Sequence, residues 1–318
     1  MHPFTKRPAE SVSALGETRL IARIRGWLGD VSPPPPSGIG DDCAVLPPNA
    51  RRQLITTDPV VYGRHFDDAV PPRRVGEMLL KRNLSDLAAM GARPTAAVVA
   101  LALDPRVRTR WLEQFYRGLA AAARRFRVPV VGGDVAQADG VLGAFLTLVG
   151  EAAGPRVLPR AGARTGDWIY VTGVLGGSRL GHFWRFTPRL AAGAWLARRR
   201  EVRAMMDVSD GLAKDLHDLT PPGARPALTA AALPVSADAR AWARRTGRTP
   251  LHHALCDGED YELVFAVAGR ADRPALERAW RRAFPRLRLT RIGRFAPAGR
   301  LPPDSLRLEK FHGYEHLQ

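Results

Sequence analysis

The residues of this sequence best suited to chemistry are carboxylates, several of which stand beside glycines. The set comprises Asp41, Asp42, Asp58, Asp86, Asp134, Asp207, Asp210, Glu259 and Asp260. Magnesium prefers hard oxygen ligands and is usually shared between a few carboxylates and the phosphates of a substrate. Aspartates that converge from separate parts of the chain could therefore hold several magnesium ions beside a triphosphate.

A simpler interpretation stays open for each carboxylate taken alone. An aspartate after a strand is often a turn former or a helix N-cap. Asp210 precedes Gly211-Leu212 and could only cap a helix, and the same holds for Ser209. The sequence lacks the G-x-x-x-x-G-K-[ST] phosphate loop and the H-E-x-x-H zinc motif, so those two enzyme classes are excluded.

Several of the carboxylates are expected where a strand gives way to a loop. Residues 53–57 are predicted as a strand that ends at Asp58, and residues 128–131 as a strand that ends at Gly132-Gly133-Asp134. Residues 204–208 lead into a helix predicted to begin near Ser209, and a strand at 261–267 follows Glu259. Open α/β sheets bind their ligands at such strand ends.

The remaining periodic segments mix helices and strands in both halves of the chain. Helices are predicted at 17–28, 73–90, 110–126 and 274–284, and strands at 95–103, 141–150, 168–172 and 287–295. The predicted fold class is therefore α/β or α+β. Because 318 residues exceed the usual size of a single core, we expect two domains, 1–153 and 154–318, divided in a polar segment that carries Gly and Pro.

The charge and the cysteine count limit the partners. The net charge is +17, but 44 of the 48 cationic residues are arginines scattered along the chain, which favours a solvated surface over a nucleic-acid stripe. The longest apolar stretch, 95–103, is too short to span a membrane. With two cysteines and no apolar leader, the protein is expected in the cytoplasm.

Six segments, read in order, resemble the bacterial thiamine-monophosphate kinase family, part of the aminoimidazole-ribonucleotide (AIR) synthetase-like ATP enzymes. They are GIGDDCAVL at 38–46, TTDPVVYGRHF at 56–66, NLSDLAAMGARP at 83–94, GGD at 132–134, MDVSDGLAKDL at 206–216 and DGEDYEL at 257–263. The resemblance runs from about Glu17 to Tyr314. It implies an AIR-synthetase-like fold of two domains, in which the N-terminal sheet pairs with that of a second subunit to form a barrel across a homodimer.

The resemblance also implies a reaction and the residues that serve it. The γ-phosphoryl group of ATP, the co-substrate, would pass to thiamine monophosphate with the help of several Mg²⁺ ions, with Asp58, Asp86 and Asp210 closest to the chemistry. The implied metal ligands are Asp42, Thr56, Thr57, Asp58, Asp86, Asp134, Asp207 and Asp210. The implied ATP contacts are Gly133, Asp134, Arg160 and Ser209, and the implied thiamine monophosphate contacts are His65, Glu259 and Tyr314.

Some positions depart from the family pattern and bear on the identity of the substrate. The segment between Gly181 and Thr187 is shorter than is usual, Val135 stands where a threonine is common, and Asp257 replaces a glycine. Two alternatives remain. The first is another ATP-dependent enzyme of the same superfamily, and the second is a catalytically idle basic binding protein.

Overall fold

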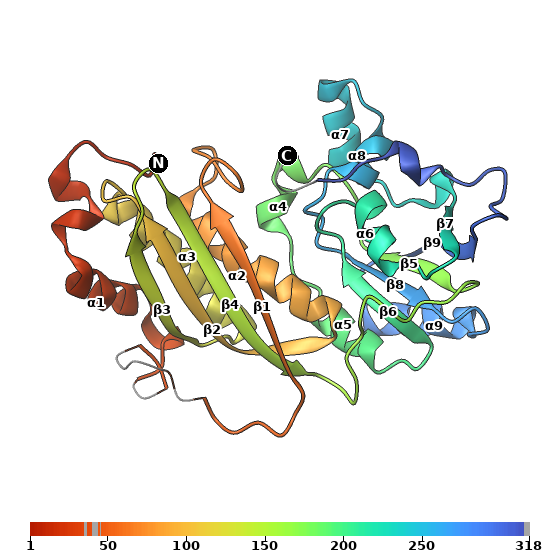
Figure 1. Ribbon diagram of the computed structural model, residues 1–318, viewed down its shortest axis with the longest axis horizontal. Helices are drawn as coiled ribbons and strands as arrows, with labels where there is room; N and C mark the ends of the chain where they lie inside the picture. The colour runs from red at the N-terminus through yellow and green to blue at the C-terminus, as the bar shows by residue number, and fades with distance from the viewer. Residues whose placement is uncertain (35–36, 40–43, 45, 315–318) are drawn as a thin grey trace. The chain divides into compact units, whose positions relative to one another are not determined.

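The computed structural model describes residues 1–34, 37–39, 44 and 46–314, and the chain folds into two compact units (Figure 1). The first unit comprises Met1–Leu87 and Arg93–Ala152, and the second comprises Ala88–Ala92 and Ala153–Gln318. Each unit is built on its own β-sheet. The architecture is thus a mixed α/β fold with two sheets. Asp42 lies outside the described residues.

The first unit is a mixed four-stranded sheet covered on one face by helices (Figure 1). The strand order is β1-β4-β2-β3, in which β1 and β4 are antiparallel and β2 and β3 are parallel. Helices α2 and α3 lie on one face, and α1 packs against α3. The bounds are α1 Glu17–Leu28, β1 Gln53–Val61, α2 Pro72–Ala89, β2 Ala92–Leu103, α3 Thr109–Phe126, β3 Val130–Gln137 and β4 Leu142–Ala152.

The covering helices follow from apolar periodicity and from close packing. In α3 the buried residues Trp111, Phe115 and Leu119 recur at the spacing of one helical face. A Cβ atom at Gly76 of α2 would overlap the carbonyl oxygen of Phe115, and one at Gly118 of α3 would overlap that of Arg73. The two helices therefore cross with their backbones in contact, which fixes α2 against α3.

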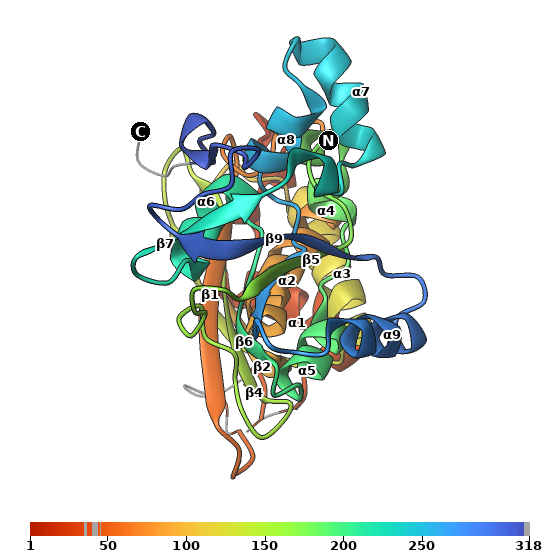
Figure 2. The ribbon, with the colours of Figure 1, turned by 90° about the vertical axis from the view of Figure 1, so that its right-hand side faces the viewer.

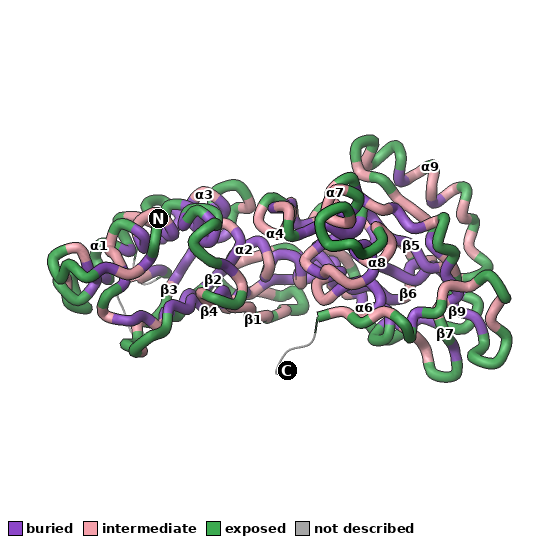
Figure 3. Tube along the Cα trace, turned by 90° about the horizontal axis from the view of Figure 1, so that it is seen from above, coloured by how far each residue is buried: buried purple, intermediate pink, exposed green. Residues whose placement is uncertain are grey.

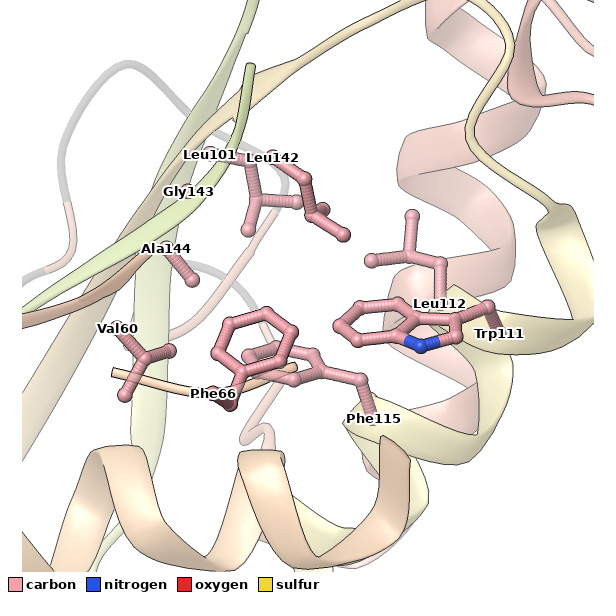
Figure 4. Close-up of a pocket in the computed structure, with 9 residues that line it drawn as sticks. All are labelled: Val60, Phe66, Leu101, Trp111, Leu112, Phe115, Leu142, Gly143 and Ala144. Carbon is pink, nitrogen blue, oxygen red and sulfur yellow. The ribbon is translucent and has the colours of Figure 1, made fainter. Parts of the chain in front are cut away.

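Aromatic side chains fill the space between α3 and the sheet, as Figure 4 shows. Phe66 stacks on Trp111 and Trp111 on Phe115, with ring centroids 5.7 Å and 5.8 Å apart. The gap left among these side chains is about 10 Å³, about the space that one water molecule needs. This region is a packed core rather than a ligand pocket, and it anchors the turn that carries His65.

The opposite face of this sheet carries large apolar side chains that are exposed to solvent. Ile55 of β1 is 73% exposed, Phe145 of β4 42% and Val98 of β2 38%. They alternate along their strands with residues of the buried face, as the two-residue period of a strand requires. We call Ile55, Val98 and Phe145 the open sheet face.

The second unit is a five-stranded antiparallel sheet in the order β6-β8-β5-β9-β7 (Figure 2). One apolar cluster contains Ile169, Met206 and Leu216, and another contains Tyr170 and Met205, so both faces are buried (purple in Figure 3). The bounds are β5 Trp168–Thr172, α4 His182–Arg185, α5 Leu190–Ala197, β6 Val202–Asp207, α6 Leu212–Leu219, β7 Ala224–Leu228, α7 Ala237–Thr246, α8 Pro250–Cys256, β8 Leu263–Val267, α9 Arg273–Ala283 and β9 Leu289–Pro297.

Two predicted strand ends are wrong. Asp58 lies within β1, opposite Leu146, and the strand continues through Pro59 because β1 is at the sheet edge, where a missing N–H group costs no ladder bond. Asp134 lies within β3, opposite Ala100, because Gly132 and Gly133 stay extended beside β2. Neither aspartate owes its place to a strand end. The helix predicted near Ser209 begins at Leu212.

Candidate functional site

In the first unit, a hydroxyl of β1 and a carboxylate of α2 meet. Thr56 Oγ1 donates a hydrogen bond of 2.6 Å to Asp86 Oδ2. The carbonyl oxygen of Asp58 accepts from Asn83 Nδ2 at 3.4 Å, and Arg82 Nε lies 3.9 Å from Asp58 Oδ2. Thr56, Asp58 and Asp86 are therefore neighbours at the contact of β1 with α2, with a guanidinium beside the Asp58 carboxylate.

Thr57 and His65, which the family resemblance implies as site residues, do not point toward Asp86 in the way that Thr56 does. Thr57 Oγ1 donates to the carbonyl oxygen of Leu146 at 3.0 Å, so its hydroxyl lies across the β1–β4 ladder, away from Asp86. His65 Nδ1 accepts from the backbone N–H of Val61 at 3.1 Å, which fixes the imidazole ring at the end of β1. The Thr56 side chain thus lies with Asp58 and Asp86, whereas the Thr57 side chain does not.

Gly133 and Asp134 line a small apolar pocket of the first unit, of about 70 Å³. Its other walls include Ile24 and Leu28 of α1 and Tyr116 of α3. Tyr116 is not among the residues predicted from sequence, because its place in an apolar helical pattern indicates only a core residue. The signal that could have singled it out is the phenol, which is polar yet buried, and burial raises the pKa of Tyr116 well above its usual value.

In the second unit, the loop from β6 to α6 carries several carboxylates. Asp207 is the buried last residue of β6, and Asp215 lies one turn into α6. Asp215 Oδ2 accepts hydrogen bonds from the backbone N–H groups of Ser209 at 3.0 Å and Asp210 at 3.2 Å. Burial, and then the negative charges of Asp207 and Asp210, raise the pKa of Asp215 to about 8. A bound cation would relieve this crowding of negative charge.

The segment around Glu259 is bonded to that same loop. The backbone N–H of Glu259 donates to the carbonyl oxygen of Ser209 at 2.7 Å, and that of Tyr261 to Val208 at 2.8 Å. Glu259 and Tyr261 have φ angles of 54° and 52°, in the left-handed region. Non-glycine residues adopt this region when the surrounding structure imposes it, and they cluster at functional sites.

The C-terminal segment reaches the loop from another direction. The backbone N–H of Tyr314 donates to the carbonyl oxygen of Asp210 at 2.9 Å. A Cβ atom at the preceding residue, Gly313, would overlap this same oxygen, so the approach requires a glycine there. Three segments far apart in the sequence therefore meet in the second unit, and they bring together Asp207, Ser209, Asp210, Glu259 and Tyr314.

Buried polar groups support the segment that carries Glu259. Asp260 is buried; its Oδ1 accepts from the backbone N–H of Gly176 at 2.7 Å, while Oδ2 has no hydrogen-bond partner among the described residues. Burial raises the pKa of Asp260 well above its usual value. Asp257 Oδ2 accepts from Gly177 at 2.9 Å, and its Oδ1 lies 2.7 Å from His253 Nδ1. Asp257, which stands where the family pattern has a glycine, thus bonds to Gly177 and lies beside His253.

The assigned residues divide between the two units. Arg160, in the second unit, donates to Asp218 Oδ2 at 2.8 Å in a largely exposed pair. Within the described residues, no group of three or more His, Cys, Asp or Glu side chains is arranged to hold a metal ion. Magnesium nevertheless fits carboxylates that stand singly or in pairs, because it takes one or two carboxylates and completes its shell with water and substrate phosphates.

No helix in the described part of the chain is long and apolar enough to cross a membrane.

Comparison with known proteins identifies similar chains. Residues 40–152 match the family described as AIR synthase related protein, N-terminal domain. The thiamine-monophosphate kinase of Rhodopirellula baltica is 38% identical over 262 residues, which cover 79% of this chain and 82% of the relative. The crystal structure of thiamine-monophosphate kinase from Stenotrophomonas maltophilia K279a has a TM-score of 0.73 at 33% identity and covers 89% of this chain and 95% of its own. A structure described as AaThiL complexed with AMPPCP and TMP has a TM-score of 0.70 at 29% identity, covering 99% of this chain and 100% of its own.

Proposed function

Because the chain belongs to the thiamine-monophosphate kinase family, we propose that it transfers the γ-phosphoryl group of ATP to the phosphate of thiamine monophosphate, giving thiamine diphosphate. One observation in this structure carries the proposal beyond likeness. The loop that holds Ser209 and Asp210 is hydrogen-bonded through its own backbone to Glu259 and Tyr314. Residues assigned to ATP and metal thus lie in one site with residues assigned to the acceptor.

In the second unit, Glu259 and Tyr314 are proposed to bind thiamine monophosphate. The thiazolium ring of this substrate is cationic, so a carboxylate beside it is favourable. Tyr314 is 46% exposed and offers an aromatic ring to a cationic heterocycle. Ser209 would contact ATP, while Asp207 and Asp210 would hold magnesium.

In the first unit, the proposed metal ligands are Thr56, Thr57, Asp58, Asp86 and Asp134, together with Asp42, which lies outside the described residues. Gly133 and Asp134 would contact ATP. His65 would contact thiamine monophosphate. Arg160, in the second unit, would contact a phosphate group and would exchange its exposed partner Asp218 for it.

The chain's own contribution to the reaction is positioning and charge compensation. The acceptor is already an anionic phosphate, so it needs little activation by a base, and aligned reactants account for much of the rate. The Thr56 hydroxyl would keep the Asp86 carboxylate in place as the substrates bind, and the bond from the backbone N–H of Asp210 to Asp215 would fix the main chain that carries the Asp210 carboxylate. Magnesium, when bound, supplies the positive charge that offsets the phosphate oxygens.

A homodimer is part of the proposal. The open sheet face exposes Ile55, Val98 and Phe145 on one side of a sheet whose other side is covered by helices. Exposed large apolar side chains on one face of a sheet are consistent with an interaction surface. It supports an arrangement in which this face meets the same face of a second copy.

The test is direct product analysis. Purified protein is incubated with ATP, magnesium and thiamine monophosphate, and the mixture is separated by chromatography. We expect thiamine diphosphate and ADP in equal amounts, and neither product with thiamine as the acceptor or with magnesium removed by a chelator. Folded protein that yields no thiamine diphosphate with any divalent metal would contradict the proposal.

A further inference from the structure

Lys214 is one of four lysines in the chain, and it joins two parts of the site described above. It lies in the first turn of α6, and its side chain is 36% exposed. Lys214 Nζ donates to Asp210 Oδ2 at 2.8 Å and to the carbonyl oxygen of Tyr314 at 2.6 Å. One ammonium group thus binds residues that lie about a hundred positions apart in the sequence.

The two contacts differ in kind and act in the same direction. The bond to Asp210 is charge-assisted, which makes it stronger than a neutral hydrogen bond, and it places a fixed cation on a carboxylate of the loop. The bond to Tyr314 holds the main chain of the C-terminal segment, whose N–H is already bonded to Asp210. With Lys214 in place, Tyr314 is held to Asp210 directly through its N–H, and its carbonyl group is tied to the Asp210 carboxylate by way of the Lys214 ammonium group.

We propose that Lys214 is a positioning residue for the acceptor. It fixes the main chain of Tyr314 against Asp210, so that the distance between the Tyr314 ring, which would contact the acceptor, and Asp210, which would hold magnesium, stays constant. The inference rests on the proposed function for the identity of the acceptor. The backbone bond from Tyr314 to Asp210 does not involve Lys214, so the fold survives the loss of the ammonium group while the segment loosens.

The first test is steady-state kinetics of Lys214→Met, which keeps the aliphatic stem and removes the charge. A contact that holds substrate and transition state alike appears in KM, so we expect the KM for thiamine monophosphate to rise about tenfold, with kcat and the KM for ATP each within about twofold of wild type. Lys214→Arg retains charge and donors and should recover most of the loss. Lys310→Met, an exposed lysine of the same C-terminal segment, is the matched control and should match wild type.

The second test does not depend on activity. Hydrogen exchange of the peptide that contains Tyr314 reports the bond from its N–H to Asp210. We expect faster exchange in Lys214→Met than in wild type, wild-type rates in Lys310→Met, and unchanged exchange in β8.

Each outcome decides the proposal. An unchanged KM for thiamine monophosphate with unchanged exchange at Tyr314 would overturn it. So would an equal rise in both KM values, or a loss that Lys214→Arg does not recover, because these indicate general damage. Should wild type form no thiamine diphosphate, the proposed function fails, while the exchange comparison still shows whether Lys214 holds the segment.

Discussion

At the scale of single residues, the carboxylates of the site are expected to separate by kinetic effect. Asp58→Asn removes a charge that would face the metal and phosphate end of the site, where charge develops during transfer. We expect kcat to fall by about a hundredfold or more at saturating substrate, as measured by steady-state assays. Asp139→Asn, in the exposed turn between β3 and β4, serves as the control. A variant at Asp58 that keeps most of its kcat would contradict this assignment.

His65 is expected to behave differently from Asp58. His65→Ala removes a ring assigned to the acceptor, so the KM for thiamine monophosphate should rise while the KM for ATP stays close to wild type. The alternative is a structural histidine, since Nδ1 already accepts from Val61. In that case a thermal melt would show lost stability and both KM values would move together.

Asp260 gives the folded protein a dependence on pH. Burial raises its pKa from the ordinary value of 3.8, so the neutral carboxyl is favoured in the fold. The stability that this adds is complete below that ordinary value and is lost as pH rises through the folded pKa. Asp260→Asn imitates the neutral form. The melting temperature of the variant minus that of wild type should increase by a few degrees as pH rises from about 5 to about 9.

The control for this comparison is Asp304→Asn, which changes an exposed carboxylate of the same unit. Its melting temperature should follow that of wild type across the range. If the profiles of Asp260→Asn and wild type run parallel, Asp260 does not titrate with folding, and its charge must be balanced by a group that this interpretation omits.

At the scale of elements, Asp104 connects the end of β2 to two turns. Its oxygens accept from Arg106 N at 2.8 Å, Arg106 Nη2 at 2.7 Å and the N–H of Gly140 at 2.7 Å. Asp104→Ala removes the buried acceptor of these three hydrogen bonds and should lower the free energy of unfolding by about 2–4 kcal/mol in urea titration. Asp104→Asn keeps an acceptor and should lose less; equal losses would mean that packing, not these bonds, matters.

Prediction from sequence worked for elements whose period is strong. Helices α1 and α3 and the strands β2 and β8 were predicted because their apolar residues recur regularly. The short helix α7 was not, because arginines break up its pattern and its start depends on Ser236 Oγ accepting from the N–H of Ala239. Short elements of this kind are decided by caps and tertiary contacts rather than by periodicity.

For the candidate site, the residues could be predicted from sequence, but their contacts could not. Motif residues such as Asp207, Asp210 and Glu259 could be named, because glycines and carboxylates stand out in a basic chain. Asp215 and Lys214 are in the same motif and were missed as contacts, because their partners are set by how the loop at Gly211 turns into α6. Long-range bonds such as Tyr314 to Asp210 leave no local pattern to read.

At the scale of the whole molecule, the open sheet face leads to a prediction about assembly. Wild type should show about twice the monomer mass of 34.7 kDa in light scattering at micromolar concentration. Phe145→Glu places a charge on the open sheet face and should yield monomer with an unchanged melting curve at low concentration. Arg64→Glu, an exposed change in the turn after β1, is the control. A wild type that is monomeric would contradict the dimer.

The proline in β1 has a consequence for the protein in concentrated solution. The backbone N–H of Tyr62 donates to the carbonyl oxygen of Leu142 on β4. Because backbone N–H groups alternate in direction along a strand, the nitrogen of Pro59 faces away from β4, toward the open edge of the sheet. An exposed strand edge is a template on which foreign strands can polymerise, and a residue without an N–H group interrupts that template. Pro59 therefore limits how far any additional strand can extend along β1, a safeguard against aggregation that catalysis would never reveal.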